Sequence, residues 1–336
     1  MTRIVYCDDS QPGITRRKVR HGWGYWDADG KRITDREEID RLNAIGLPPA
    51  YRDAWYCPKP NGHIQAVGWD DKGRKQYRYH VDFRSKRESA KYDGCADFAR
   101  RLPKLRARVD KDLRRTGLSK ERALAAVVRL LDTAHLRVGN EGYAKSNKSF
   151  GATTLRKRHA DTHGNKVKLE FRAKSGKLKR LTLTDKALVR FVKKCDDLPG
   201  QHLFGWLDDD GQMHPVSSSD VNDYIRDAMG AEYTAKHFRT WGASVLAFEA
   251  LHGSDRDIGL KAMLEPVTEH LGNTPAIARK SYVHPLLVAI AKSGDQAKLR
   301  DRALPRSSSH LTRAERGLIA LLDGGARVRR ALKLAA

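Results

Sequence analysis

The sequence is poor in cysteine and lacks the usual cofactor motifs. No CxxC or Cys/His spacing suggests a zinc site or a disulfide framework, so we predict reduced, structural thiols at Cys7, Cys57, Cys95 and Cys195. No GxxxxGK loop is present and no GxGxxG follows a predicted strand, so we expect neither ATP nor a dinucleotide. The acidic clusters at 70–71 and 208–210 fall at predicted turns, and we therefore predict no metal ion and no cofactor.

Long hydrophobic runs are absent as well. No stretch approaches the roughly 20 apolar residues that a membrane-spanning helix needs, which excludes a membrane partner of that kind. The first residues, MTRIVYCDDSQPG, lack the apolar region of a signal peptide. We therefore expect a cytoplasmic protein.

What the sequence has in excess is positive charge. Its 336 residues include 65 Lys and Arg against 41 Asp and Glu, a formal net charge of +24. Such an excess indicates a polyanionic partner, and nucleic acid is the first candidate. The length and the 40% hydrophobic content suffice for about two domains, each with its own core.

The first 80 or so residues have the pattern of a small β-rich domain. Apolar runs flank a DADG turn in residues 21–33 and a DDKG turn in residues 62–81, which predicts two hairpins. Between them, Thr34 and Glu37 have the spacing of a capping box and predict one short helix, closed by Gly46. The pattern loses its period after residue 82, so we predict domains at 1–82 and 83–336.

The second domain is predicted to be mainly α. Apolar residues recur every three or four positions in six segments: 95–115, 119–140, 185–195, 218–229, 235–251 and 259–272. Between the second and third of these the period drops to two, with Val167, Leu169 and Phe171 on one face, a Lys-Ser-Gly turn, and then Leu181 and Leu183. The last thirty residues add one or two short helices. The fold class is therefore α+β, with a small β-rich domain followed by a mainly α domain that contains a short sheet.

Three positions in the second domain carry cations in unusual surroundings. Arg137 lies on the apolar pattern near the end of a predicted helix, where it either faces an anion or extends over the core to solvent. Lys174 occupies the tip of the predicted hairpin. Arg239 is bracketed by two aromatic residues at the start of an apolar helix, three positions after Lys236, and needs an anionic partner that could be a ligand or a carboxylate.

Two further positions follow in the stretch GNTPAIARKSYVHP. Asn273 has the position of a helix N-cap ahead of Pro275. Tyr282 follows an Arg-Lys pair at the end of a basic helical segment, and by itself it could be an ordinary half-buried aromatic residue.

Taken together and in this order, Arg137, Lys174, Lys236 with Arg239, Gly272-Asn273 and Tyr282 resemble the active-site series of the type IB DNA topoisomerases, in their small poxvirus-like and bacterial form. Residues 46–80 look like that family's N-terminal DNA-clamping domain, and the β-then-α order agrees over nearly the whole chain. The resemblance implies the catalytic fold shared with tyrosine recombinases and a two-domain clamp around duplex DNA.

The resemblance also implies roles for these residues. Tyr282 would attack a backbone phosphate and become linked to the DNA 3′ end, so that the cut strand rotates and is rejoined without ATP or metal. Arg137 and Arg239 would contact the scissile phosphate, and Lys174 would protonate the leaving 5′ oxygen. Asn273 stands where many members have histidine; its amide can still donate a hydrogen bond but supplies no positive charge.

The remaining implied residues bind DNA. Lys236 matches the lysine of a K-x-x-R motif beside the phosphate, and Gln76, Tyr77 and Tyr79 match positions that touch the major groove. The same RKQYRY run also contains Arg74 and Lys75. Duplex DNA is thus the expected partner of a nucleoid-associated monomer.

Two other functions remain to be weighed against this one. A tyrosine recombinase uses the same chemistry, but recombinases usually carry histidine three residues before the second arginine, where this chain has Lys236, and their N-terminal module is helical. A non-catalytic nucleic-acid-binding protein would explain the charge through phosphate contacts and stacking. It would leave the ordered series of cations unexplained.

Overall fold

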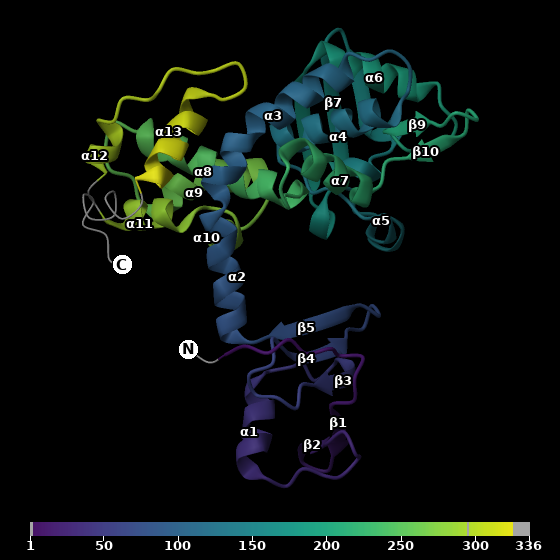
Figure 1. Cartoon of the computed structure of the whole chain (residues 1–336), viewed down its shortest axis with the longest axis vertical. Coiled ribbons are helices and arrows are strands. Elements are labelled where there is room, and N and C mark those ends of the chain that lie inside the picture. Colours follow the sequence, from purple (N-terminus) through teal and green to yellow (C-terminus); the bar gives the residue numbers. More distant parts are fainter. Residues whose placement is uncertain (1–2, 294–295, 325–336) are drawn as a thin grey trace. The chain divides into compact units, whose positions relative to one another are not determined.

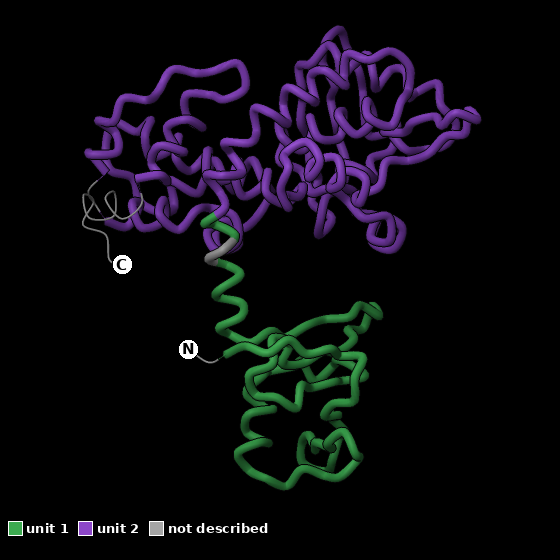
Figure 2. Tube along the Cα trace, viewed as in Figure 1, with its two compact units in different colours: residues 1–93 green, residues 94–336 purple. Residues whose placement is uncertain are grey.

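The computed structural model describes residues 3–293 and 296–324, and the chain forms two compact units, residues 1–93 and 94–336 (Figure 2). The units divide at Asp93/Gly94 and not at the expected 82/83, because helix α2 (Val81–Asp93) continues the first unit beyond its last strand. Most of the described side chains of α2 are exposed, and Phe83 and Tyr92 are buried. So few apolar positions give no helical period in the sequence.

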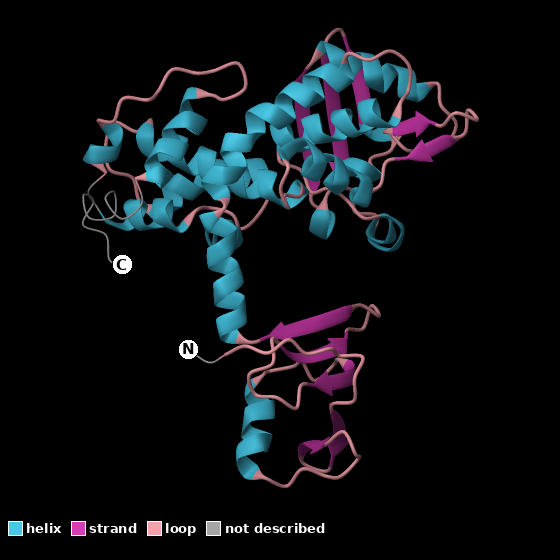
Figure 3. Cartoon of the chain, in the orientation of Figure 1, coloured by secondary structure: helices cyan, strands magenta, loops and turns pink. Residues whose placement is uncertain are grey.

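The first unit is a five-stranded antiparallel sheet with one short helix, α1 (Arg36–Ala44) (Figures 1 and 3). The strand order is β2-β1-β3-β4-β5, so β2 and β5 form the edges. The strands are β1 (Ile14–Val19), β2 (Gly22–Trp26), β3 (Arg52–Tyr56), β4 (Ile64–Trp69) and β5 (Lys75–Tyr79). The helix covers a core built from Ile14, Tyr25, Leu42, Leu47, Ala54, Tyr56 and Ala66.

One predicted hairpin is confirmed and the other forms only in part. Strands β4 and β5 pair around the DDKG turn as expected. Strand β2 pairs along its length with β1, and across the DADG turn it makes one bridge, Trp26 with Arg32, flanked by two backbone hydrogen bonds. The N-cap of α1 is Asp35, not Thr34; its carboxylate accepts a hydrogen bond from the Glu37 amide. Both residue types cap helices, and sequence spacing alone does not choose between neighbours.

Two cysteines distant in sequence meet in this unit. The Sγ atoms of Cys7 and Cys57 lie 3.0 Å apart, although 50 residues separate them. Cys7, Cys57, Cys95 and Cys195 are all outside disulfide bonds.

The second unit is mainly helical, as predicted, with a three-stranded sheet of order β6-β7-β8 (Figure 3). Its helices are α3 (Cys95–Leu113), α4 (Lys120–Ala134), α5 (Glu141–Asn147), α6 (Lys186–Asp196), α7 (Ser218–Met229), α8 (Ala235–His252), α9 (Leu260–Leu271), α10 (Pro275–Ser281), α11 (Pro285–Ser293), α12 (Ala297–Arg300) and α13 (Arg313–Asp323). Its strands are β6 (Ala160–His163), β7 (Lys166–Arg172) and β8 (Leu178–Thr184), with a separate pair β9 (Gly205–Leu207) and β10 (Met213–Pro215).

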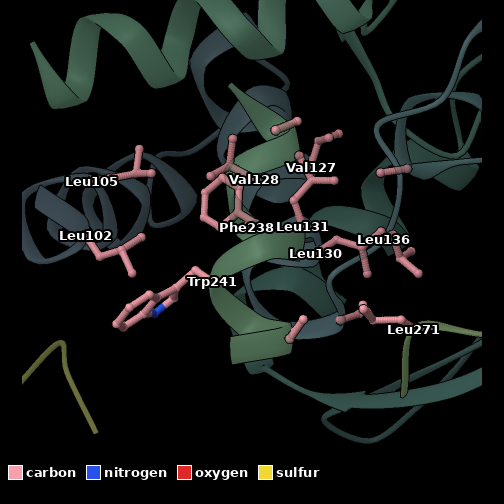
Figure 4. Packing of buried hydrophobic residues seen from close by; sticks show 14 of the residues in the cluster. Leu102, Leu105, Val127, Val128, Leu130, Leu131, Leu136, Phe238, Trp241 and Leu271 are labelled. Atoms are coloured by element: carbon pink, nitrogen blue, oxygen red, sulfur yellow. The ribbon is translucent and has the colours of Figure 1, made fainter. Parts of the chain in front are cut away.

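The core of this unit forms around α8. Figure 4 shows Phe238 and Trp241 of α8 among the leucines and valines of α3 and α4. The Trp241 indole donates a hydrogen bond of 3.1 Å to Glu315 of α13, whose carboxylate also pairs with Arg106. Burial of this many large apolar side chains is the main stabilising term of the unit, and it holds α8 rigidly in place.

The sheet has the predicted faces and register. Val167, Leu169 and Phe171 are all buried, and Val167 pairs with Leu183 and Leu169 with Leu181. The turn between β7 and β8 is a single 3-10 turn, Lys174–Gly176, in which Ser175 and Gly176 have φ of 66° and 72° and reverse the chain.

The second predicted helix is shorter than expected. Helix α4 ends at Ala134, because His135 adopts a left-handed conformation with φ of 49°. Arg137 therefore lies in an extended connection and not on a helix, and Asn140 caps the start of α5 by accepting a hydrogen bond from the Tyr143 amide.

The C-terminal expectation is met in part. Helix α13 is one of the one or two helices predicted for the last thirty residues, and residues 325–336 lie outside the described part of the chain. Among residues 3–293 and 296–324, none of the helices is both long and apolar enough to cross a membrane.

Candidate active site

A small hollow in the second unit brings together three of the predicted cations. Arg137, Lys174 and Arg239 all line it, although 102 residues of chain separate the first from the last in the sequence. Five pieces of backbone meet there: the connection after α4, residues 150–151 after α5, the β7–β8 hairpin, the first turns of α8 and the C-terminal end of α9.

Arg239 forms the buried floor of this site. Its side chain is on the second turn of α8 and the residue is only 5% exposed. Its two terminal nitrogens donate to backbone carbonyls, Nη1 to His135 and Nη2 to Leu271 at 3.5 Å, while Nε has no partner. Burial, followed by the charge of Arg137, lowers the pKa of this guanidinium.

The surroundings of Arg239 decide between the two interpretations that the sequence allowed. Within the described residues no carboxylate pairs with it, so the structural salt bridge is not formed. A buried guanidinium that is bonded to two carbonyls and to the Tyr282 phenol, and that keeps an unused N–H at Nε, is suited to an anionic ligand that enters the hollow.

Arg137 and Asn273 form a second, linked pair. Arg137 Nη2 donates to Asn273 Oδ1 at 3.1 Å, and the amide nitrogen of Asn273 is buried without a partner. Asn273 does not cap α10 as expected; Thr274 does, by accepting from the Ile277 amide. The cap is one residue later because Thr274 directly precedes Pro275, which occupies the first helical position.

Lys174 lies at the exposed hairpin tip, where the sequence placed it. Two lysines that sequence reasoning missed hold this hairpin against the end of α9. Lys177 donates to the Gly272 carbonyl at 3.1 Å, and Lys179 donates to the His270 carbonyl. Their spacing of two on a predicted strand places both on one face, and this was the signal available in the sequence.

Tyr282 follows the last turn of α10 and is half-buried. The guanidinium carbon of Arg239 lies 4.9 Å from the centre of its ring. Burial alone would raise the pKa of the phenol, but the charge and hydrogen bonding of Arg239 and the charges of Arg137 and Lys174 outweigh it and lower that pKa below its ordinary value. Three cations from separate elements thus favour the phenolate at one oxygen.

None of the residues predicted to bind DNA lines this hollow. Lys236 is exposed on the first turn of α8 and does not line it. The others belong to edge strand β5 and the turn before it in the first unit. Tyr77 and Tyr79 are 40% and 45% exposed and stack with ring centres 5.9 Å apart.

Three polar side chains of this strand and the turn before it are paired with carboxylates. Arg74 and Gln76 both donate to Asp70, at 2.8 and 3.0 Å, and Lys75 pairs with Asp9 while lying over the Tyr77 ring. Edge strand β5 therefore presents aromatic rings and cations together.

The fold and this site define a class of protein. A mainly α unit with a short sheet, in which a buried and a half-buried arginine act on one phenol, is suited to act on a phosphodiester. Two family models match the chain. Residues 80–280 match the catalytic core of eukaryotic DNA topoisomerase I, and residues 22–70 match the N-terminal domain of bacterial DNA topoisomerase IB. The first match ends two residues before Tyr282.

Curated relatives agree with these models. DNA topoisomerase 1B of Acanthamoeba polyphaga mimivirus is 32% identical over 285 residues, covering 81% of this chain and 85% of the relative. DNA topoisomerase 1B of vaccinia virus (strain Copenhagen) is 21% identical over 232 residues, covering 67% and 72%. The chain belongs to the type IB DNA topoisomerase family.

One solved structure completes the comparison. The pre-cleavage complex of the XerH site-specific recombinase bound to difH substrate matches 55% of this chain and 49% of its own, with a TM-score of 0.37 and 18% identity. A likeness at this level adds nothing to the assignment.

Proposed function

We propose that this type IB topoisomerase relaxes supercoiled duplex DNA with Tyr282 as its nucleophile. The observation that carries the proposal is the geometry of the site: the Arg239 guanidinium lies 4.9 Å from the centre of the Tyr282 ring and lines one hollow with Arg137 and Lys174. Against the effect of burial, these cations lower the pKa of the phenol. An unperturbed tyrosine has a pKa near 10 and is mostly protonated at neutral pH, so a cationic site increases the reactive phenolate.

In the proposed step the Tyr282 phenolate attacks the scissile phosphorus and displaces the 5′ oxygen of the next nucleotide. The new bond is a phosphotyrosine at the DNA 3′ end, and the displaced oxygen takes a proton to become a 5′ hydroxyl. Negative charge grows on the nonbridging oxygens during attack. The unused N–H groups of Arg239 Nε and Asn273 Nδ2 are suited to bind those oxygens, with Arg137 beside them.

We assign Lys174 as the acid that supplies this proton. An alkoxide is a poor leaving group, so general acid catalysis at the 5′ oxygen matters in both directions of the reaction. Lys174 lines the hollow from an exposed tip, and Lys177 holds the tip to Gly272, next to Asn273. The covalent link preserves the phosphodiester energy, so neither ATP nor a metal is required for rejoining.

DNA binding is assigned to edge strand β5 and to Lys236. Tyr77, Tyr79 and Gln76 would contact the duplex, with Arg74 and Lys75 exchanging their carboxylate partners for phosphates.

All five proposed catalytic side chains come from one unit of one chain, which supports a monomer. Chromosomal DNA as the substrate fits a cytoplasmic, nucleoid-associated enzyme.

The alternative functions lose their support. The family assignment separates the chain from tyrosine recombinases and from passive binders. His237 is the histidine nearest to the position that recombinases use. Here its Nδ1 accepts a hydrogen bond of 3.0 Å from the Thr234 amide and so caps the start of α8.

The first experiment is relaxation of supercoiled plasmid in EDTA without ATP, with Tyr282→Phe in parallel and detergent trapping of covalent complexes. We expect relaxation and protein attached to the 3′ end with wild type. We expect neither with the variant, which should still bind DNA. Residual relaxation by Tyr282→Phe, or an adduct at the 5′ end, would rule out Tyr282 in this role.

A further inference from the structure

Two histidines lie directly behind the site without a part in the proposed chemistry. His135 is the residue that ends α4, and His270 is on the last turn of α9. His135 Nδ1 and His270 Nε2 are 2.9 Å apart, and the two rings cross at 61°. The pair therefore joins two segments that are 135 residues apart in the sequence.

One hydrogen bond joins the two rings, in which one nitrogen donates and the other accepts. His270 is also hydrogen-bonded to the backbone of Ala134. Both rings are neutral: burial and neighbouring cations lower the pKa of His270, and burial lowers that of His135 to about 3.

The segments joined by this pair are the ones that hold both arginines. The His135 carbonyl accepts from Arg239 Nη1, and the carbonyl of Leu271, next to His270, faces Arg239 Nη2. Two residues further along one segment, Arg137 donates to Asn273 on the other. A change in the separation of the two segments would therefore move Arg137 and Arg239 together.

His135 has an unfavourable backbone conformation, and its ring packs closely against α8. Its φ of 49° is left-handed, a conformation that residues other than glycine adopt uncommonly. On the other side of the ring, a Cβ built on Gly242 of α8 would lie 2.1 Å from His135 Nε2, so only glycine leaves room for the imidazole. The surrounding structure thus holds His135 in a strained conformation, and the carbonyl of this same residue accepts the hydrogen bond from Arg239.

We propose that the hydrogen-bonded His135–His270 pair is a positioning element that sets the two arginines at the distance required by the scissile phosphate and the Tyr282 phenol. The proposal rests on the proposed function of these arginines. Neither histidine touches the reacting atoms. Their effect passes through the His135 carbonyl to Arg239 and through the connection after α4 to Arg137.

The test compares truncation with replacements that retain the hydrogen bond. His135→Ala and His270→Ala remove it. His135→Asn places an amide where Nδ1 lies and tolerates the left-handed conformation, and His270→Gln places an amide where Nε2 lies. His252→Ala is the matched control, since His252 also makes one hydrogen bond, to the Arg302 carbonyl at 2.9 Å, at the far end of α8.

We expect each alanine variant to reduce the single-turnover cleavage rate by about 10–100-fold, because small displacements of positioned groups have effects of this size. DNA affinity should be unchanged. The double alanine variant should be no slower than either single one, and His135→Asn and His270→Gln should recover most of the rate. Wild-type cleavage by His270→Ala, or equal losses in rate and affinity, would overturn the proposal.

A second measurement is independent of catalysis. The pKa of Tyr282, followed by NMR of labelled tyrosine and assigned with Tyr282→Phe, should rise in His270→Ala because the lowering effect of the arginines weakens. It should not rise in His252→Ala. If the wild-type protein forms no 3′ adduct, the proposed function is contradicted and the positioning role is not. If the pKa of Tyr282 is unchanged in His270→Ala, the positioning role is contradicted and the proposed function is not.

Discussion

The hollow of the second unit and edge strand β5 of the first unit both present cations, but they hold them in opposite ways. Arg239 is buried, bonded to carbonyls and without a carboxylate among the described residues. Arg74 and Lys75 are exposed and each is paired with one, Asp70 or Asp9.

This difference indicates that the two regions affect different quantities, the cleavage rate and the DNA affinity. A buried cation without a counterion has already been desolvated during folding, so its full charge acts on the phosphate as the reaction proceeds. An exposed cation must exchange a carboxylate and water for a phosphate, which changes the free energy little at each such site. The hollow should therefore control rate, and edge strand β5 should control affinity and its salt dependence.

The largest effect is expected from Arg239→Ala. An arginine that stabilises the transition state of phosphoryl transfer contributes about 10³–10⁵-fold, so single-turnover cleavage should fall by that order. Arg239→Lys should recover only a part, because an ammonium cannot reach both carbonyls and the phosphate. Loss of DNA affinity in place of cleavage rate, measured by filter binding, would erase the distinction between the two regions.

Lys174→Ala should reduce cleavage of ordinary DNA by about 10²–10⁴-fold, the usual contribution of a general acid. A duplex in which sulfur replaces the bridging 5′ oxygen tests the role directly. A thiolate leaves without a proton, so this substrate should be cleaved by Lys174→Ala about as fast as by wild type. A deficit of equal size on both substrates would show that Lys174 binds phosphate and is not the acid.

A smaller effect is expected in the pH dependence. Arg137 is one of the cations that lower the pKa of Tyr282, so Arg137→Gln should raise that pKa. Cleavage requires the phenolate, and its rate rises with pH up to the phenol pKa. The rising limb of the pH–rate profile should therefore move to higher pH in the variant. A profile that keeps its midpoint while the rate falls would mean that Arg137 acts on the phosphate alone.

The sequence predicted the parts of the site that depend on local pattern and missed those that depend on distant contacts. Lys174 is at a hairpin tip because strand alternation on both sides defines the turn. Arg137 was expected on a helix, since nothing local shows that His135 ends α4. That ending depends on the space above Gly242 and on the His270 ring, which lie far along the chain.

The capping error at Asn273 has a similar origin. Local preference favours an N-cap at Asn273 at least as well as at Thr274. The hydrogen bond that Asn273 makes instead, with Arg137, spans 136 residues. The order of residue types was informative because it matched a family. Their convergence on Tyr282 required the fold.

The smallest effect should come from edge strand β5. Removing Arg74 and Lys75 together by alanine substitution should weaken DNA binding similarly on all sequences and reduce the slope of log K against log salt by about 1 for each phosphate that is no longer neutralised. The cleavage rate at saturating DNA should remain that of wild type, since neither residue lines the hollow.

Tyr77→Ala is the companion variant, because it removes a stacking ring without a charge and should weaken binding with no change in the slope of log K against log salt. A lower cleavage rate at saturation in either variant would mean that edge strand β5 takes part in the chemistry, and the division between rate and affinity would then fail.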